Sequence, residues 1–145
     1  MGVRVVGFAA TVVATVLACG AASAQNDQER FANYPWQIFA TDHNGHVYKI
    51  MAAEPSPGHP TWRQIGVLVD YAQPVTLSGV QARSTIDITE VNCATYETRI
   101  LNLNYFTGPT GSGQRHKAPE LANPAWGPST PGSISRQLAE HACAS

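Results

Sequence analysis

Alternating apolar and polar positions in the middle of the chain predict β-strands with a period of two. Residues 84–93 and 96–105 form a pair in which Ile and Leu alternate with Asp, Thr and Asn. We therefore expect each of these strands to bury one face and hydrate the other. Residues 36–40 and 46–51 form another pair, and residues 62–71 form a further long strand. These elements predict an antiparallel sheet.

The same alternation assigns side chains to the two faces of the predicted strands. One face of the long strand is apolar and comprises Ile65, Val67, Val69 and Tyr71. The carboxylates of the strands are expected on the hydrated face, and they are Asp70, Asp87, Glu90 and Glu97. Acidic side chains are rarely buried without a partner, so this pattern indicates solvent-facing residues rather than a catalytic pair.

Turn signals separate the predicted strands. Residues 42–45 contain Asn-Gly, whose tolerance of positive φ favours a tight hairpin between the first two strands. Residues 54–60 carry three prolines and a glycine, which predicts a loop. Residues 74–81 are expected to turn the chain. Residues 107–131 are rich in Gly and Pro and predict a long connection, with a short edge strand at 114–117.

The end of the chain predicts one helix. Thr130 is the expected N-cap, followed by Pro131 in the first turn. Apolar residues then recur at i, i+4 and i+8 on a helix of about 11 residues, and they are Ile134, Leu138 and Ala142. Together the elements predict an α+β fold, with a small antiparallel β-sheet of about five or six strands and the C-terminal α-helix packed on its apolar face.

The first 24 residues have the pattern of a secretory signal peptide. A basic start precedes an apolar run of about 14 residues, which is shorter than the ~20 needed to span a bilayer as a helix. Ala24 ends a small-x-small motif, so we expect cleavage between Ala24 and Gln25. The polar residues 25–35 are then a flexible leader, and residues 36–145 form the folded domain.

Cys19 offers a different ending of the signal. The residues before it resemble a lipoprotein signal, although Leu17 stands where a small residue is usual, and lipidation of Cys19 would anchor the domain to a membrane. Cleavage after Ala24 instead leaves two cysteines, Cys93 and Cys143. An even count in an oxidising compartment predicts one disulfide, which would link the helix to the sheet.

Composition and charge exclude two classes of protein. The chain has a formal net charge of −1 and no basic run, which argues against electrostatic binding of nucleic acid. Hydrophobic residues make up 43% of the chain, which is too many for a disordered protein. A small globular domain remains.

Few side chains are spaced for catalysis or for holding a cofactor. Residues 108–113 have the glycine spacing of a phosphate loop, but Gln114 and Arg115 stand where a lysine and a hydroxyl are needed. No nucleophile motif such as Gly-x-Ser-x-Gly or His-Glu-x-x-His occurs. A non-enzymatic protein is therefore expected, and a small secreted hydrolase that uses sheet carboxylates is the less favoured alternative.

The five histidines predict no metal site and no resident cofactor. His43 and His46 flank the Asn-Gly turn, and no thiolate or carboxylate is placed to complete a zinc site with them. Surface contact with a metal porphyrin through His43, His46 or His116 is a minor alternative, and covalent haem is excluded because Cys-x-x-Cys-His is absent.

One basic cluster is a candidate contact surface for a partner. Arg115, His116 and Lys117 follow the flexible glycines and could meet an acidic ligand, because binding residues often lie on connections of a rigid sheet.

An ordered set of short motifs resembles the bacterial surface-adhesin protein E family. The motifs are Val67–Pro74, Glu90–Cys93, Arg99–Leu101, Tyr105–Gly108, Gly111–Gly113, Trp126–Pro128, Pro131–Ser133 and Cys143, preceded by the hairpin Asp42–Tyr48. Lys49 departs from the pattern, which usually has an acidic residue after the tyrosine. No host-binding residue of the family can be placed on a matching position.

The resemblance implies an exported protein of a Gram-negative bacterium, in the periplasm or at the cell surface, with a sheet and a disulfide-linked C-terminal helix. It further implies a surface lipoprotein that forms a homodimer, adheres to extracellular-matrix proteins of a host such as vitronectin and laminin, and binds haem. We therefore expect an exported, non-enzymatic binding protein. A periplasmic structural or assembly factor of the cell envelope is the alternative.

Overall fold

The computed structural model describes residues 33–119 and 124–145. Within them, seven strands and one helix follow in the order β1 (Gln37–Thr41), β2 (Val47–Ile50), β3 (Glu54–Ser56), β4 (His59–Leu77), β5 (Val80–Asn92), β6 (Thr98–Phe106), β7 (Arg115–Lys117) and α2 (Ile134–Cys143). The predicted α+β class is confirmed, and the strand count exceeds the prediction by the short strand β3. The predicted signal peptide, Cys19, the Ala24–Gln25 cleavage site and most of the predicted leader lie outside the described residues.

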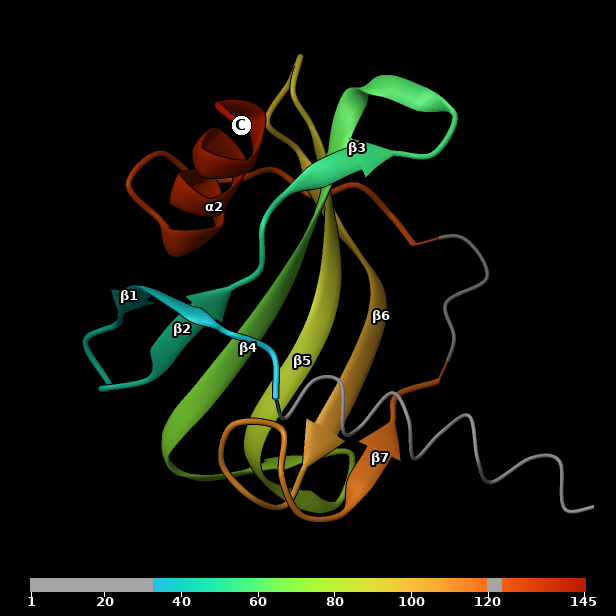
Figure 1. The fold of residues 1–145 in the computed structure, drawn as a ribbon. Helices are drawn as coiled ribbons and strands as arrows, with labels where there is room; N and C mark the ends of the chain where they lie inside the picture. The colour runs from blue at the N-terminus through green and yellow to red at the C-terminus, as the bar shows by residue number, and fades with distance from the viewer. Residues whose placement is uncertain (1–32, 120–123) are drawn as a thin grey trace, which may run out of the picture.

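All seven strands form one open antiparallel sheet (Figure 1). The strand order is β1-β2-β4-β5-β6-β7, and β3 pairs with the start of β4. The Asn-Gly hairpin joins β1 and β2 as predicted, with Gly45 at a φ of 81°. Asp42 supports this turn because its Oδ1 accepts the backbone N–H groups of Asn44 and His46, at 2.9 and 3.0 Å.

Two stretches expected to be loop or turn are strand instead. In residues 54–60, expected to be a loop, β3 folds back on the start of β4 through Gly58, whose φ is 76°. Pro55 is tolerated there because β3 pairs only with β4 and so needs few ladder donors. In residues 74–81, β4 continues through Pro74 to Leu77, and the turn itself is Ser78-Gly79. The pairing register shifts between Asp70 and Val75, so the proline falls where the ladder is already interrupted.

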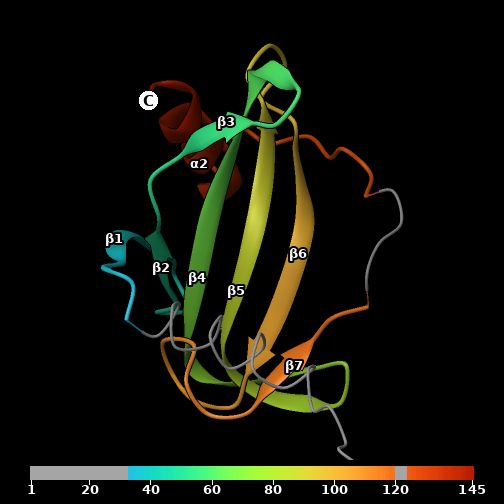
Figure 2. The ribbon, with the colours of Figure 1, turned by 45° about the vertical axis from the view of Figure 1, so that its right-hand side comes forward.

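The C-terminal helix is present, and its first residue is set by a different cap from the one predicted. The side-chain oxygen of Ser133, not that of Thr130, accepts the N–H of Arg136 at 3.1 Å. Leu138, Ala139 and Ala142 are buried against the sheet. In Figure 2, α2 lies beside β4 on one side of the sheet, and β6 lies away from it.

Each face of the central strands carries its own apolar cluster. On the face covered by α2, the cluster comprises Ile50, Ile65, Val67, Val69, Val91, Leu138, Ala139 and Ala142. The predicted shared face of the long strand is therefore confirmed. On the opposite face, Leu68, Ile86 and Phe106 are completely buried and pack against Trp36. The central strands β4 and β5 are therefore covered on both sides.

This two-sided burial overturns the assignment of Asp87 and Glu90 to a hydrated face. Ile86 faces away from α2, so Asp87 and Thr89 face toward it, and only 9% of Asp87 stays exposed. Glu90 lies on the other face and is 3% exposed. The alternation shows that neighbouring residues point to opposite sides, but it cannot show that one of those sides is wet.

The other two carboxylates also differ from the prediction. Asp70 on β4 is only partly exposed, and it accepts hydrogen bonds from Lys49 and Thr110. Glu97 is not on a strand, because residues 93–97 form the connection between β5 and β6. Its carboxylate accepts the hydroxyl of Thr95 at 2.9 Å.

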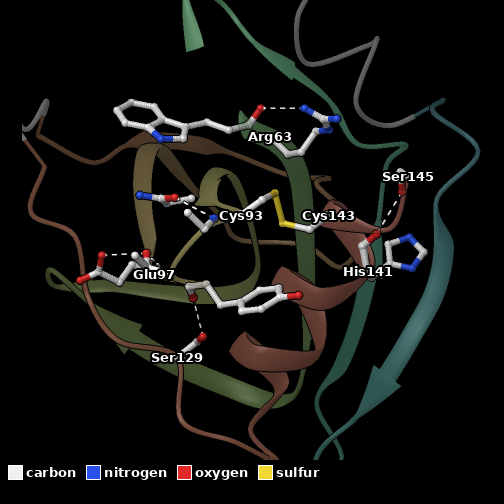
Figure 3. Close-up of a disulfide and its surroundings, with 12 residues drawn as sticks. Arg63, Cys93, Glu97, Ser129, His141, Cys143 and Ser145 are labelled. Atoms are coloured by element: carbon white, nitrogen blue, oxygen red, sulfur yellow. Dashed lines mark hydrogen bonds between the residues drawn. A yellow bond between two sulfur atoms is a disulfide. The ribbon is translucent and has the colours of Figure 1, made fainter. Parts of the chain in front are cut away.

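The predicted disulfide joins Cys93, just after β5, to Cys143 in the last turn of α2 (Figure 3). The two Cα atoms are 5.6 Å apart. The start of the helical segment is held separately, because Ser129 Oγ donates to the carbonyl of Tyr96 at 2.5 Å. The helical segment is therefore attached at both ends to the connection between β5 and β6. No helix within residues 33–119 and 124–145 is long and apolar enough to span a membrane.

Candidate functional site

A hollow of the described surface runs along β6, past the start of that strand where Thr98 contacts Ser135 of α2. It has a volume of about 500 Å³, and we call it the β6–β7 groove. Its lining comprises Ile100, Leu101, Asn102, Leu103, Tyr105, Lys117, Ala118 and Pro119. The helix packs chiefly on β4 and β5 (Figure 1), so Ile100 keeps 42% of its surface exposed. The groove therefore presents apolar side chains from a rigid strand to solvent.

The predicted basic cluster forms the edge strand β7, which confirms the short strand expected near residues 114–117. Pairing with β6 places Lys117 opposite Asn104 and His116 opposite Tyr105. Alternation along the strand puts His116 on the face opposite to Arg115 and Lys117, so the three side chains do not form one surface. Arg115 Nε donates to Asn104 Oδ1 at 2.9 Å, and of the three residues only Lys117 lines the groove.

The glycine-rich residues 108–113 form a loop that is bound to the sheet. Asp70 Oδ1 accepts the N–H of Thr110 at 2.5 Å, and Asp70 Oδ2 accepts Lys49 Nζ at 2.7 Å. Gly111 has a φ of 69°, and a Cβ there would lie 2.8 Å from Ile86 Cδ1, so glycine is required. Its N–H donates to Ser84 Oγ at 2.9 Å. The loop therefore covers the apolar cluster around Ile86. Lys49 stabilises the loop through its ion pair with Asp70, which accepts the N–H of Thr110.

An ion pair buried on the face opposite to α2 was not foreseen from the sequence. Arg99 Nε and Nη2 lie 2.7 and 2.6 Å from Glu90 Oε2, and Ser56 Oγ donates to Glu90 Oε1. The Arg99 guanidinium also lies over the ring of Trp126, at 4.4 Å from its centroid, and over that of Trp62 at 5.3 Å. Burial raises the pKa of Glu90, but the bonds from Ser56 and Arg99 outweigh it and hold that pKa below its usual value.

Three of the five histidines make local packing or turn contacts. His46 Nδ1 accepts the N–H of Ala72 at 3.1 Å, and the ring of His59 stacks on that of Trp62 with centroids 3.7 Å apart. His141 makes an edge contact with Phe39. Among the residues that the structure describes, no three His, Cys, Asp or Glu side chains gather in a way that could hold a metal ion.

Asp87 lies under α2, where burial raises the pKa of its carboxyl to about 7. The hydroxyl of Thr89 donates to Asp87 Oδ1 at 2.7 Å and partly opposes this rise. In the unfolded chain an aspartate has a pKa of about 3.9. At pH values between about 3.9 and about 7, Asp87 is therefore protonated in the folded protein and ionised in the unfolded chain.

We predict that stability falls as the pH rises through this interval. Because the folded state binds more protons there, Asp87 should lower the free energy of unfolding by about 2 to 3 kcal/mol between pH 5 and pH 8. Asp87→Asn should remove that slope. Urea denaturation of both proteins at several pH values checks this, and parallel pH profiles of the two would contradict it.

A family model described as surface-adhesin protein E matches residues 36–144, nearly all of the predicted domain. The chain belongs to the surface-adhesin protein E family. The resemblance seen in the sequence motifs is thereby confirmed. Among curated proteins, no sequence matches this chain.

Solved structures support the fold of this surface-adhesin protein E domain. Crystal form II of Haemophilus influenzae protein E superposes with a TM-score of 0.59 at 19% identity, over 75% of this chain and 87% of that chain. Protein E from non-typeable Haemophilus influenzae gives a TM-score of 0.57 at 19% identity, over 75% of each chain. At this level of identity, the likeness concerns the fold alone.

Two features of this surface-adhesin protein E domain escaped sequence reasoning. The β6–β7 groove depends on where α2 lies, which the helix's own apolar stripe does not specify. The buried Asp87 and Glu90 depend on cover over both faces of the sheet. The completely apolar run of residues 65–69 was an available signal, because strands covered on both sides lose the polar half of the alternation.

Proposed function

We propose that this chain is an exported, non-enzymatic adhesin that binds a host extracellular-matrix protein through the β6–β7 groove. The observation that carries the proposal is the uncovered apolar strip on β6 in a chain of the surface-adhesin protein E family. Protein surfaces that bind other proteins combine an apolar centre with a polar rim. Leu103 and Tyr105 supply such a centre, and Asn102 and Lys117 supply the rim.

The groove fits one kind of occupant, an extended segment of a protein that carries apolar side chains beside an acidic one. The apolar side chains would lie on the floor formed by Ile100 and Leu103. The acidic residue would lie near Lys117, which is exposed at the end of β7 and provides charge complementarity.

The positions of the buried carboxylates count against the hydrolase alternative. Asp87 faces α2 whereas Glu90 faces the other side of the sheet, and Glu90 is already bonded to Arg99 and Ser56. Carboxylate pairs that catalyse hydrolysis must converge on one bond. These two carboxylates point to different faces, which favours binding over catalysis.

Export of the chain is part of this proposal. We infer that residues 1–24 are removed and that the mature chain begins at Gln25, free of a lipid anchor. Lipidation at Cys19 would instead keep the domain on a membrane. The mass of the N-terminal peptide of the exported protein distinguishes the two, since a diacylglyceryl group on Cys19 would overturn the start at Gln25.

Binding of residues 25–145 to immobilised matrix proteins tests the proposed function. Saturable binding at micromolar concentration is expected. Ile100→Glu should weaken it at least about tenfold, because a charge in the apolar centre of an interface costs 1.4 kcal/mol or more. Ile38→Glu on β1 is the matched control, because Ile38 is also exposed, at 74%, but lies at the opposite edge of the sheet.

Three outcomes would contradict the proposal. The first is no saturable binding to any matrix protein, and the second is an equal loss in Ile100→Glu and Ile38→Glu. The third is a change of oligomeric state in Ile100→Glu, measured by light scattering, with matrix binding intact. That result would assign the groove to a contact between copies of this chain.

A further inference from the structure

A second hollow lies between α2 and the sheet, next to the surface proposed for protein binding. We call it the sub-helix cavity, and its volume is about 250 Å³. Its walls are mostly apolar, with Val67 and Val69 from β4 and Ile134 and Leu138 from α2. Only Ile100 lines both this cavity and the β6–β7 groove.

Asp87 is the charged group in the wall of this cavity. Its Oδ1 accepts the Thr89 hydroxyl at 2.7 Å, and its Oδ2 has no hydrogen-bond or ion-pair partner among the residues that the structure describes. Only 9% of the residue is exposed, so bulk water provides little solvation. Buried carboxylates are normally paired, because an unpaired one is costly. Asp87 is therefore a nearly buried carboxylate with one hydrogen bond from Thr89 in a mostly apolar wall, and a ligand that brings a cationic donor can pair with it.

No basic group of the surrounding elements supplies that donor. From α2, Ile134, Ser135 and Leu138 line the cavity, whereas Arg136 pairs with Glu140 and lies over the ring of Tyr96. The titratable side chains that the other elements bring near Asp87 are phenols, namely Tyr48 on β2, Tyr71 on β4 and Tyr105 on β6. Among the described residues, none therefore supplies a cationic donor to Asp87.

We propose that the sub-helix cavity binds a small organic cation, a primary ammonium group carried on a compact apolar body. The ammonium would donate to Asp87 Oδ2 and form the ion pair that the cavity wall lacks. The apolar body would contact the side chains of Val69, Ile134 and Leu138. A cavity of about 150 Å³ with apolar walls already admits benzene, so one ring with an aminomethyl group fits in this volume.

Benzylamine and benzyl alcohol test the proposal, because they have nearly the same shape and differ in the cationic group. Each is titrated into residues 25–145 at pH 8 while the methyl signals of Val67, Val69, Ile134 and Leu138 are followed by NMR. Benzylamine should shift these signals to saturation in the millimolar range, and benzyl alcohol should bind at least about tenfold more weakly. At pH 6, benzylamine should bind about tenfold more weakly than at pH 8, because Asp87, with a pKa of about 7, is then mostly protonated.

Two variants assign the binding to Asp87. Asp87→Asn keeps the size of the side chain and an acceptor for Thr89, and it should abolish the preference for benzylamine over benzyl alcohol. Glu97→Gln is the matched control, because it removes one carboxylate from the connection between β5 and β6 and should bind as the unaltered chain does. If Asp87→Asn does not fold, Val69→Ile, which fills part of the cavity and keeps Asp87, should weaken benzylamine binding at least about threefold.

Three results would overturn the proposal. The first is that none of the four methyl signals shifts with benzylamine, which would mean that the cavity holds water only. Equal binding of the two probes would mean an apolar void without a role for the charge. The third is an undiminished preference for benzylamine in Asp87→Asn, which would place the cation elsewhere. None of these results bears on matrix binding through the β6–β7 groove.

Discussion

Removal of the disulfide by Cys93→Ser together with Cys143→Ser is expected to lower the free energy of unfolding by about 4 kcal/mol, since the bond closes a loop of 50 residues. The chain-entropy model gives this value, because the bond restricts the unfolded chain far more than the folded one. Replacing both cysteines avoids a lone thiol that could form dimers. Urea denaturation without reductant measures the effect.

The loss should be concentrated in α2. A helix of 10 residues is marginal by itself in water, and α2 depends on its contacts with the sheet. Without the bond, its last turn can separate from Ile65 and Val91, and its amides should exchange with solvent faster than those of β5. The unaltered chain in reductant is the control and should lose the same stability. A loss below about 1 kcal/mol, or equal exchange in α2 and β5, would contradict the prediction.

Arg99→Met is expected to lower the free energy of unfolding by about 3 to 5 kcal/mol, because it leaves the Glu90 carboxylate buried without its cation. Glu90 is 3% exposed, and Arg99 supplies two of its contacts. Methionine keeps an unbranched apolar side chain beside Trp62 and Trp126, so the change mainly tests the charge. The loss should be larger at pH 7 than at pH 4, where Glu90 can take up a proton.

A double-variant cycle separates the ion pair from the packing. Glu90→Gln with Arg99→Met should recover much of the loss, since an uncharged amide costs less to bury than an unpaired carboxylate. Chemical denaturation of the two single variants, the double variant and the unaltered chain gives the coupling energy. Strictly additive losses would mean that Arg99 acts through its stacking on the tryptophans, not through its charge.

The local elements of the fold could be predicted because each depends on a few neighbouring residues. The Asn-Gly turn specifies its hairpin through positive φ at Gly45, and the stripe from Ile134 to Ala142 specifies the helix. The cysteine pair followed from the count of cysteines that remains after the predicted signal peptide is removed. Strand β3 could not be predicted from its prolines, because it exists through pairing with the start of β4, a tertiary contact.

The candidate sites were harder to predict than the elements. Arg115, His116 and Lys117 are adjacent in sequence, but alternation along β7 turns them to different faces, so proximity along the chain overstated their proximity in space. Asp87 was assigned to water because its neighbours are isoleucines. In the folded chain, Ile86 contacts Leu68 and Phe106 on one face, and Asp87 lies under α2 on the other. Whether Asp87 is buried or hydrated therefore depends on where α2 lies.

The position of α2 over β4 and β5 has a consequence for how the domain can diversify. Leu101 and Asn102 lie in the β6–β7 groove and belong to neither apolar cluster. Substitutions there change the shape and chemistry offered to the partner that we propose, while the residues that hold the sheet and helix together stay the same. A lineage with this architecture can therefore exchange one partner for another by drift along β6, with little loss of stability at any step.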